Sequence, residues 1–314
     1  PIAGAPAVNV VDAINARTLS ADEAGQLANE ALAASGNEIV PEGPRWTLWG
    51  DSDKKVGSGM LVVDSQDGLH LAYNDYIPLV DKPRAIYNYC PASAACEKGE
   101  CWIGVEFGTD VLRVMLAATK AGNPRLLLQQ EGKVFGSGKD YYYAACDSAC
   151  DQIGNWQIGY VTSTWGTEIH DVFDSAKSLR AFALDANDRP GFVFNDRNYF
   201  HYEPDHLGGF YTWCESNCTS GTPEAKTWKE AYIGGGSEYD ADIYAVPVLV
   251  YTSDSKPRVL VEVTTGDAGK ERMGIIYKSC NANCDQTASW HHTRIAERGY
   301  ETYVSWDMAL DEQN

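Results

Sequence analysis

Four short apolar runs in the middle of the chain decide its fold. They read LRAFALD at residues 179–185, RPGFVF at 189–194, GFYTWC at 209–214 and WKEAYI at 228–233. Segments rich in Gly, Pro, Asn and Asp separate one run from the next, which is the pattern of short β-strands joined by turns. The region 179–233 therefore predicts one four-stranded antiparallel sheet.

The same succession of runs occurs three more times in the chain. A unit before it reads LRVMLA (112–117), NPRLLL (123–128), YYYAAC (141–146) and WQIGYV (156–161); a unit after it reads AVPVLV (245–250), KPRVLV (256–261), GIIYKSC (274–280) and WHHTRI (290–295); and a less regular first unit reads MLVVD (60–64), LHLAY (69–73), AIYNYC (85–90) and WIGVEF (102–107). Four strands per unit, repeated in series, are typical of a β-propeller. One such sheet cannot bury both of its faces alone, so neighbouring units must pack as blades.

Two features of each repeat have a structural interpretation. The Trp that opens the fourth run is expected to wedge between blades. Asp185 ends an Ala-Leu-Asp sequence that recurs at Asp311, and it is expected to form a tight turn between the first two strands.

The cysteines favour small disulfide loops over metal sites. Three pairs share the Cys-x-x-x-Cys spacing and are far apart in the sequence, whereas structural zinc sites bring such pairs together. The predicted disulfides are Cys146–Cys150, Cys214–Cys218 and Cys280–Cys284. Cys90, Cys96 and Cys101 form a looser group in which one cysteine stays unpaired. Disulfides predict an oxidising compartment, so the protein is expected to be secreted, on the cell surface or in the periplasm.

The two ends of the chain differ from the repeats. Residues 1–44 contain a capping box at 20–23 and then an Ala- and Leu-rich stretch, which predicts a helical N-terminal arm. Residues 45–314 form the predicted propeller. The stretch 45–50 matches a lone fourth strand and 303–311 a lone first strand. Together they predict either a composite, incomplete blade that closes a ring of about five blades or a piece of a longer propeller. The chain begins at Pro1, which favours a processed or trimmed product.

The sequence Ala-Leu-Asp with a following Pro, the Tyr-x-x-Cys-x-x-x-Cys run and the downstream Trp together resemble the repeats of secreted bacterial sialidase-like (BNR-type) β-propeller proteins. The resemblance covers roughly residues 45–311 and implies the propeller fold. The sequence departs from sialidases in two respects. It has no true Asp box, because Asp67 and Gly68 stand at the wrong spacing, and its arginines fall mostly at repeat turns. The resemblance therefore implies architecture and not sialidase chemistry.

The charge of the chain excludes several partners. There are 44 acidic and 25 basic residues, giving a net charge near −19. Nucleic-acid binding needs clustered Lys and Arg, so no nucleic-acid partner is expected. No apolar run approaches the roughly 20 residues that span a bilayer, so no membrane insertion is expected either.

Candidate binding residues gather on one predicted face, where the loops between strands two and three and the crossovers between blades emerge. The longest such loop, 195–206, offers a possible metal site at His201, Glu203, Asp205 and His206, together with Tyr199 and Tyr202. The crossovers add the carboxylates of Asp171, Asp174, Asp240 and Asp242. Converging carboxylates favour Ca²⁺ or a basic ligand.

These patterns predict a binding or scaffold propeller that recognises a glycan or a surface protein through its acidic, Tyr-rich loop face. One alternative is a glycan-active hydrolase, since two carboxyl groups suffice for glycoside hydrolysis. Another is a structural subunit of a larger extracellular assembly, in which another chain completes the composite blade. The sequence contains no nucleophile or phosphate-loop motif, so it assigns no catalytic residue.

Overall fold

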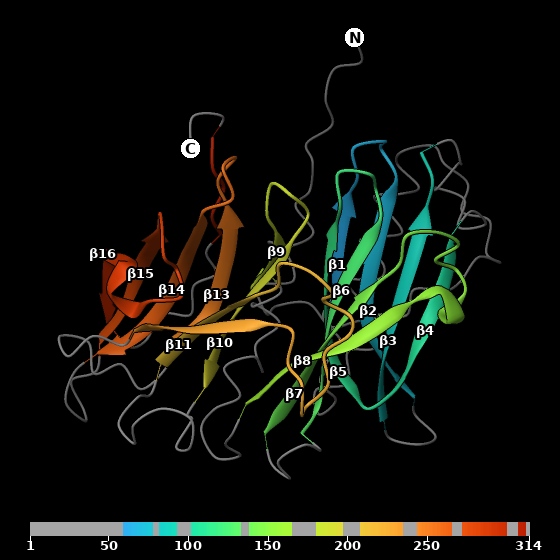
Figure 1. Cartoon of the computed structure of the whole chain (residues 1–314), viewed down its shortest axis with the longest axis horizontal. Coiled ribbons are helices and arrows are strands. Elements are labelled where there is room, and N and C mark those ends of the chain that lie inside the picture. The colour runs from blue at the N-terminus through green and yellow to red at the C-terminus, as the bar shows by residue number, and fades with distance from the viewer. Residues whose placement is uncertain are drawn as a thin grey trace, which may run out of the picture. The chain divides into compact units, whose positions relative to one another are not determined.

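The computed structural model describes residues 59–77, 82–92, 102–132, 138–164, 180–196, 208–234, 244–265, 272–299 and 307–311. All of them belong to one compact unit, formed by residues 57–94 and 102–314. They form sixteen β-strands in four four-stranded antiparallel sheets (Figure 1). This confirms the all-β, propeller-like class with repeated four-stranded blades.

Each sheet is one blade, and consecutive strands pair in chain order. Blade 1 comprises β1 (Gly59–Val63), β2 (Leu69–Ile77), β3 (Lys82–Cys90) and β4 (Ile103–Thr109). Blade 2 comprises β5 (Val111–Ala118), β6 (Pro124–Glu131), β7 (Lys139–Ala145) and β8 (Gln157–Thr164). Blade 3 comprises β9 (Phe182–Leu184), β10 (Pro190–Asp196), β11 (Gly208–Trp213) and β12 (Lys229–Gly234). Blade 4 comprises β13 (Tyr244–Tyr251), β14 (Pro257–Thr265), β15 (Arg272–Cys280) and β16 (Trp290–Gly299). The short 3-10 helices η2 (Ile153–Asn155) and η3 (Thr287–Ser289) precede β8 and β16.

Blade 2 is covered on both faces by its neighbours, as expected if the repeated sheets pack as blades. Leu126, Leu127 and Leu128 follow one another along β6 and are each at most 2% exposed. Successive residues of a strand point to opposite faces. Leu127 belongs to a core cluster with Phe192 of blade 3, whereas Leu126 and Leu128 belong to a cluster with Tyr87 of blade 1. Burial of apolar side chains between adjacent sheets is therefore what joins the blades.

The recurrent Trp wedges between blades, as predicted. Trp156 of blade 2 meets Tyr87 of blade 1 edge-on, with ring centroids 5.2 Å apart. Trp228 meets Tyr143 in the same way at 5.4 Å. The third pair repeats this geometry between blades 3 and 4: Trp290 meets Tyr211 at 5.4 Å. Each indole is at most 7% exposed, so each wedge buries a large apolar surface.

The turn role of Asp185 is also confirmed. Its Oδ1 accepts hydrogen bonds from the backbone N–H of Asn187 and Arg189, at 2.7 and 2.9 Å. Asp64 closes the corresponding turn of blade 1 through the N–H of Gln66 and Gly68. At the end of the first strand, the short Asp side chain thus accepts the backbone hydrogen bonds that the strand ladder no longer accepts, and the chain reverses direction there.

The termini of the predicted propeller are only partly described. Residues 1–58, which include the predicted arm and the lone fourth strand at 45–50, lie outside the described residues. Residues 307–311 are described and contain no strand. The predicted first strand at 303–311 therefore does not extend over them.

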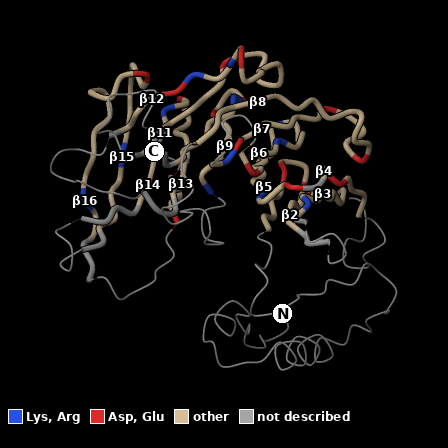
Figure 2. The backbone as a smooth tube through the Cα atoms, turned by 90° about the horizontal axis from the view of Figure 1, so that it is seen from below, with Lys and Arg blue, Asp and Glu red and all other residues tan. Residues whose placement is uncertain are grey.

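Among the described residues, no helix combines the length and the apolar character that crossing a membrane would require. Lys and Arg occur singly along the described backbone and are interspersed with Asp and Glu (Figure 2). This distribution offers no continuous basic stripe of the kind that follows a phosphate backbone.

Candidate functional site

The binding residues expected from the sequence lie outside the described residues. This applies to the six ligand-binding candidates, Tyr199, Tyr202, Asp171, Asp174, Asp240 and Asp242, and to the four metal candidates, His201, Glu203, Asp205 and His206. The glycan, Ca²⁺ and hydrolase hypotheses built on them remain predictions. Within the described part of the chain, no three His, Cys, Asp or Glu side chains are grouped so as to hold a metal ion.

The cysteine pairs form the expected disulfide loops. Cys146–Cys150, Cys214–Cys218 and Cys280–Cys284 are each disulfide-bonded, with Cα atoms 5.7 Å apart. Cys90 is disulfide-bonded as well, and its partner lies outside the described residues. These bonds indicate an extracytoplasmic location, because such disulfides form and persist in oxidising compartments.

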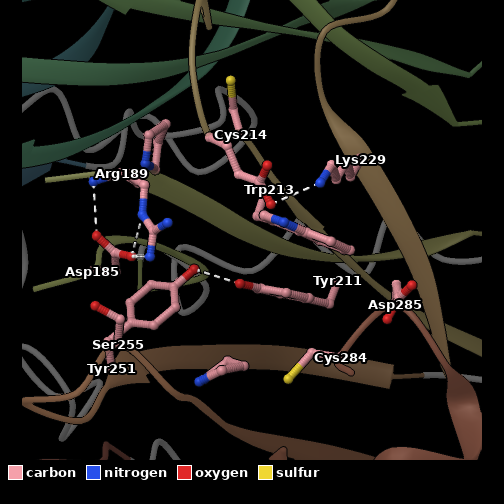
Figure 3. A pocket seen from close by; sticks show the side chains of 13 residues that line it. Asp185, Arg189, Tyr211, Trp213, Cys214, Lys229, Tyr251, Ser255, Cys284 and Asp285 are labelled. Carbon is pink, nitrogen blue, oxygen red and sulfur yellow. Dashed lines mark hydrogen bonds and ion pairs between the residues drawn. The ribbon is translucent and has the colours of Figure 1, made fainter. Parts of the chain in front are cut away.

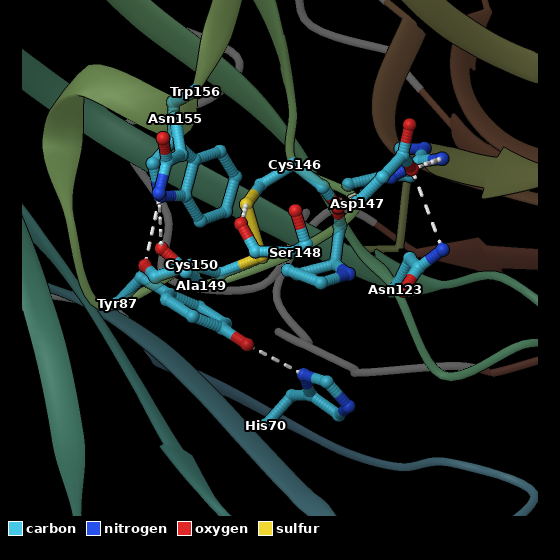
Figure 4. The surroundings of a disulfide bond; sticks show 12 residues. His70, Tyr87, Asn123, Cys146, Asp147, Ser148, Ala149, Cys150, Asn155 and Trp156 are labelled. Carbon is cyan, nitrogen blue, oxygen red and sulfur yellow. Dashed lines mark hydrogen bonds and ion pairs between the residues drawn. A yellow bond between two sulfur atoms is a disulfide. The ribbon is translucent and has the colours of Figure 1, made fainter.

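In blade 2 an arginine fixes the disulfide loop. The Nη1 of Arg125 donates to the carbonyl oxygens of Pro124 and Cys146, at 3.0 and 2.9 Å, and its Nη2 donates to Asp147 at 2.7 Å. The loop in turn accepts the indole N–H of Trp156 at the Cys150 carbonyl, 2.9 Å away (Figure 4). The Arg125 side chain thus holds the disulfide loop of blade 2 against the end of that blade.

Blade 4 repeats this arrangement. Arg258 donates to the carbonyl oxygens of Pro257 and Cys280, both at 3.0 Å, and to Asn281 at 2.9 Å. Trp290 donates to the Cys284 carbonyl at 3.0 Å. The arginine position is therefore a structural element of the repeat.

Blade 3 departs from the repeat at this position. Register pairs Gly191 with Trp213, Arg125 with Ala145 and Arg258 with Ser279. Blade 3 thus has glycine where its neighbours have the arginine, and tryptophan where they have a small residue. A Cβ atom on Gly191 would lie 1.8 Å from the hydroxyl oxygen of Tyr251, so the missing side chain is what lets Tyr251 of blade 4 lie against β10.

A cleft of about 420 Å³ lies between blades 3 and 4 beside these positions, and we term it the inter-blade cleft (Figure 3). It lies where the strand 1–2 turns and the disulfide loops emerge, opposite the loop face on which the sequence placed the candidate residues. Its lining comprises Asp185, Arg189, Pro190, Tyr211, Trp213, Cys214, Glu215, Lys229, Tyr251, Ser255, Pro257, Cys284 and Asp285.

An aromatic group forms one wall of the inter-blade cleft. Tyr211 and Trp213 lie on the same face of β11 and stack with centroids 5.1 Å apart and an interplanar angle of 11°. Trp213 is half-buried, whereas Tyr211 is 4% exposed. The Tyr211 and Tyr251 hydroxyls are 2.9 Å apart. Burial raises the pKa of both phenols, so both stay protonated well above neutral pH and can donate hydrogen bonds.

Two ion pairs supply the polar groups of the inter-blade cleft. Arg189 contacts the Oδ2 of Asp185 at 2.6 Å, and this contact raises the pKa of Arg189. Lys229 donates to Glu215 at 2.7 Å, which lowers the pKa of Glu215. The Lys229 ammonium also lies 6.0 Å from the centre of the Trp213 ring. Fixed charges beside an aromatic plane form a site with both an apolar and a hydrogen-bonding component.

Blade 1 uses the equivalent positions differently. His70 takes the arginine position, and its Nε2 lies 3.0 Å from Asp64 while its Nδ1 lies 2.7 Å from the Tyr87 hydroxyl. The carboxylate can only accept, so Nε2 carries the proton and Tyr87 donates to Nδ1. His70 and the Asp64 side chain are each 1% exposed, which excludes a ligand from this cluster.

The sequence patterns did not predict the inter-blade cleft. They predicted strands at RPGFVF and GFYTWC, and a structural role for the strand 1–2 turns and the disulfide loops. The available signal was the comparison of equivalent positions, since Gly191 stands where Arg125 and Arg258 occur. That comparison depends on strand register, which the runs alone do not fix.

Neither a protein-family model nor a curated protein matches the sequence. Solved structures align with it at low identity. An α-L-arabinofuranosidase from Lactobacillus brevis aligns with a TM-score of 0.42 and 10% identity, covering 74% of this chain and 70% of that one. A thermostable family-43 glycoside hydrolase aligns at 0.42 and 6%, covering 79% and 77%. A levansucrase from Bacillus subtilis aligns at 0.39 and 10%, covering 80% and 75%. These likenesses concern the backbone and assign the chain to no family.

Proposed function

We propose that this chain is an extracytoplasmic carbohydrate-binding propeller and that the inter-blade cleft holds a neutral sugar. The observation that carries the proposal is the half-buried Trp213 in the wall of a cleft, at a position where blades 2 and 4 have a small residue paired with an arginine. The apolar C–H face of a sugar ring packs against a flat aromatic side chain, and its hydroxyl groups pair with charged hydrogen-bonding groups at the edge. A cleft of about 420 Å³ falls in the usual range of small-molecule sites.

The charges favour a neutral ligand over an anionic one. Three carboxylates line the inter-blade cleft, at Asp185, Glu215 and Asp285, against two cations, at Arg189 and Lys229. The net charge of the whole chain, near −19, adds a repulsive field for anions. Each cation already contacts a carboxylate, so these two pairs present both donors and acceptors to hydroxyl groups, while Asp285 gives the lining a net negative charge that disfavours an anionic ligand.

The test is binding of a panel of neutral oligosaccharides by titration calorimetry. We expect at least one to bind and Trp213→Ala to weaken it about tenfold, because one aromatic contact contributes about 1–1.5 kcal/mol. Ser279→Ala, a change at the equivalent position of blade 4, is the control and should leave the affinity unchanged. If no neutral glycan binds, or if Trp213→Ala binds as tightly as the unmodified chain, the proposal is wrong.

A further inference from the structure

A second hollow lies beside the inter-blade cleft and shares one turn with it. This turn hollow, of about 250 Å³, is formed by the ends of the first strands and the strand 1–2 turns of blades 1, 2 and 3. It is lined by Val62, Val63, Asp64, Ser65, Ala118, Thr119, Lys120, Leu184, Asp185 and Asp188. Asp185 lines both spaces, and the consecutive residues Asp188 and Arg189 line one each. The turn 185–189 is therefore a ridge between them.

Hydrogen bonds fix this ridge from both sides. On the side of blade 2, Lys120 donates its backbone N–H to Asp188 at 3.0 Å and its Nζ to the Ala186 carbonyl at 2.6 Å. On the side of blade 4, Asn187 donates to the Ser255 hydroxyl at 3.1 Å. The Asp185 side chain is 6% exposed and holds the turn from within. Because these hydrogen bonds already fix the turn 185–189, a ligand that crosses it pays little entropy for ordering this part of the protein.

The turn hollow has polar and apolar surface at its rim. Ser65 and Lys120 are exposed, and the Ser65 hydroxyl donates to the Lys120 carbonyl at 2.8 Å. Val63 is exposed and contributes apolar surface. The volume of about 250 Å³ is below the roughly 300 Å³ at which independent ligand pockets begin. The turn hollow is thus better suited to an additional subsite than to a site of its own.

We infer that the ligand is a linear neutral oligosaccharide, one unit of which packs on Trp213 while the following units cross the 185–189 ridge into the turn hollow. This inference rests on the proposed function, because it extends the same site. It adds that affinity depends on chain length and that Ser65, Lys120 and Asp188 contact the units beyond the first.

The experiment compares short and long members of the best-binding neutral oligosaccharide series, from the disaccharide to the hexasaccharide. In the unmodified chain we expect the longest member to bind at least about tenfold more tightly than the shortest, which corresponds to roughly 1.4 kcal/mol. Ser65→Trp, which fills the turn hollow from an exposed position, should abolish this gain and leave the disaccharide affinity unchanged. Lys120→Met should reduce the gain, whereas Lys226→Met on blade 3 should not.

The outcomes separate the two proposals. Equal affinity for short and long oligosaccharides, or an unchanged affinity gain with chain length in Ser65→Trp, would overturn the extended site. The proposed function would still stand if Trp213→Ala weakened binding of the disaccharide. Loss of disaccharide binding in Trp213→Ala together with loss of only the length gain in Ser65→Trp supports both. Binding of no member of any series overturns both.

Discussion

The second residue of the second strand is Arg125 in blade 2, Arg258 in blade 4 and Gly191 in blade 3. The arginines donate to the carbonyl oxygens of their own disulfide loops and occupy the space beside the strand. Arg125 lies close enough to Tyr143 to lower the pKa of that phenol, although burial, the larger effect, raises it to about 12. Tyr211 is the equivalent residue of blade 3 and faces the inter-blade cleft instead. In blade 3 the Tyr251 side chain of blade 4 thus takes the space beside the strand that an arginine takes in blades 2 and 4.

We predict that Gly191→Ala destabilises the protein by about 1–3 kcal/mol, the usual cost of overpacking. The reason is steric, because the added Cβ would lie 1.8 Å from the Tyr251 hydroxyl. In a Tyr251→Leu background, which introduces the residue that blade 3 has at Leu184, the same change should cost much less. Urea unfolding midpoints of the four chains of this double-mutant cycle measure the coupling. Equal costs in both backgrounds would contradict the steric explanation.

His70 should make stability depend on pH. Burial lowers its pKa below the ordinary value, even though the hydrogen bond and the charge of Asp64 oppose this. The folded state therefore keeps the imidazole neutral, while the unfolded chain takes up a proton below about pH 6.5. The free energy of unfolding should fall as the pH drops from about 7 to 5. His70→Gln should reduce this slope, and His291→Gln, a change at an exposed position, should not. Identical slopes in all three chains would show that the pKa of His70 is the same in the folded and the unfolded state.

At the scale of the element, the disulfide loop and the Trp wedge form one unit. In blade 3 the indole N–H of Trp228 donates to the Cys218 carbonyl at 3.0 Å, while the ring packs against Tyr143 of blade 2. The disulfide fixes the loop that presents the acceptor, and the acceptor orients the wedge. The disulfide should contribute less to the free energy of unfolding than the Trp wedge does. Closing a loop this short adds only about 2 kcal/mol through the chain-entropy effect.

We predict that Trp228→Ala destabilises the protein by about 3–5 kcal/mol, the range for a large buried aromatic residue. Replacing Cys214 and Cys218 together by Ala should cost less, about 2 kcal/mol. Trp213→Ala serves as the control, because that indole is half-buried and should contribute less than either change. Thermal unfolding of the four chains gives the order. A larger effect of the disulfide than of Trp228 would mean that the loop, and not the wedge, holds the blades together.

The sequence predicted these elements well and the candidate site poorly, for a physical reason. Strands, turns and disulfide loops follow from local patterns such as the Cys-x-x-x-Cys spacing and the Asp185 turn, which need no knowledge of neighbours. The inter-blade cleft depends on which side chain of blade 4 lies against Gly191. That contact joins residues 60 positions apart, Gly191 and Tyr251, and follows only once register and blade packing are known.

At the scale of the whole molecule, the described residues form four blades that pack in chain order, and the full chain has a net charge near −19. Apolar contacts between blades must offset the mutual repulsion of the carboxylates in the folded state. Salt screens this repulsion, with a Debye length of about 8 Å at physiological ionic strength. Any stabilising effect of a divalent cation therefore has two possible sources, general screening and a specific site.

We predict that Ca²⁺ at millimolar concentration raises the unfolding temperature more than Mg²⁺ or Na⁺ at equal ionic strength. The sequence motivates a Ca²⁺ site at the crossover carboxylates of Asp171, Asp174, Asp240 and Asp242, because Ca²⁺ takes oxygen ligands. A ligand that binds only the folded chain stabilises it by about 2.7 kcal/mol at one hundred times its dissociation constant. Asp171→Asn combined with Asp240→Asn should remove the difference between the cations and keep the common effect of screening. If all three salts act equally on the unmodified chain, screening alone explains the stabilisation and the predicted calcium site is wrong.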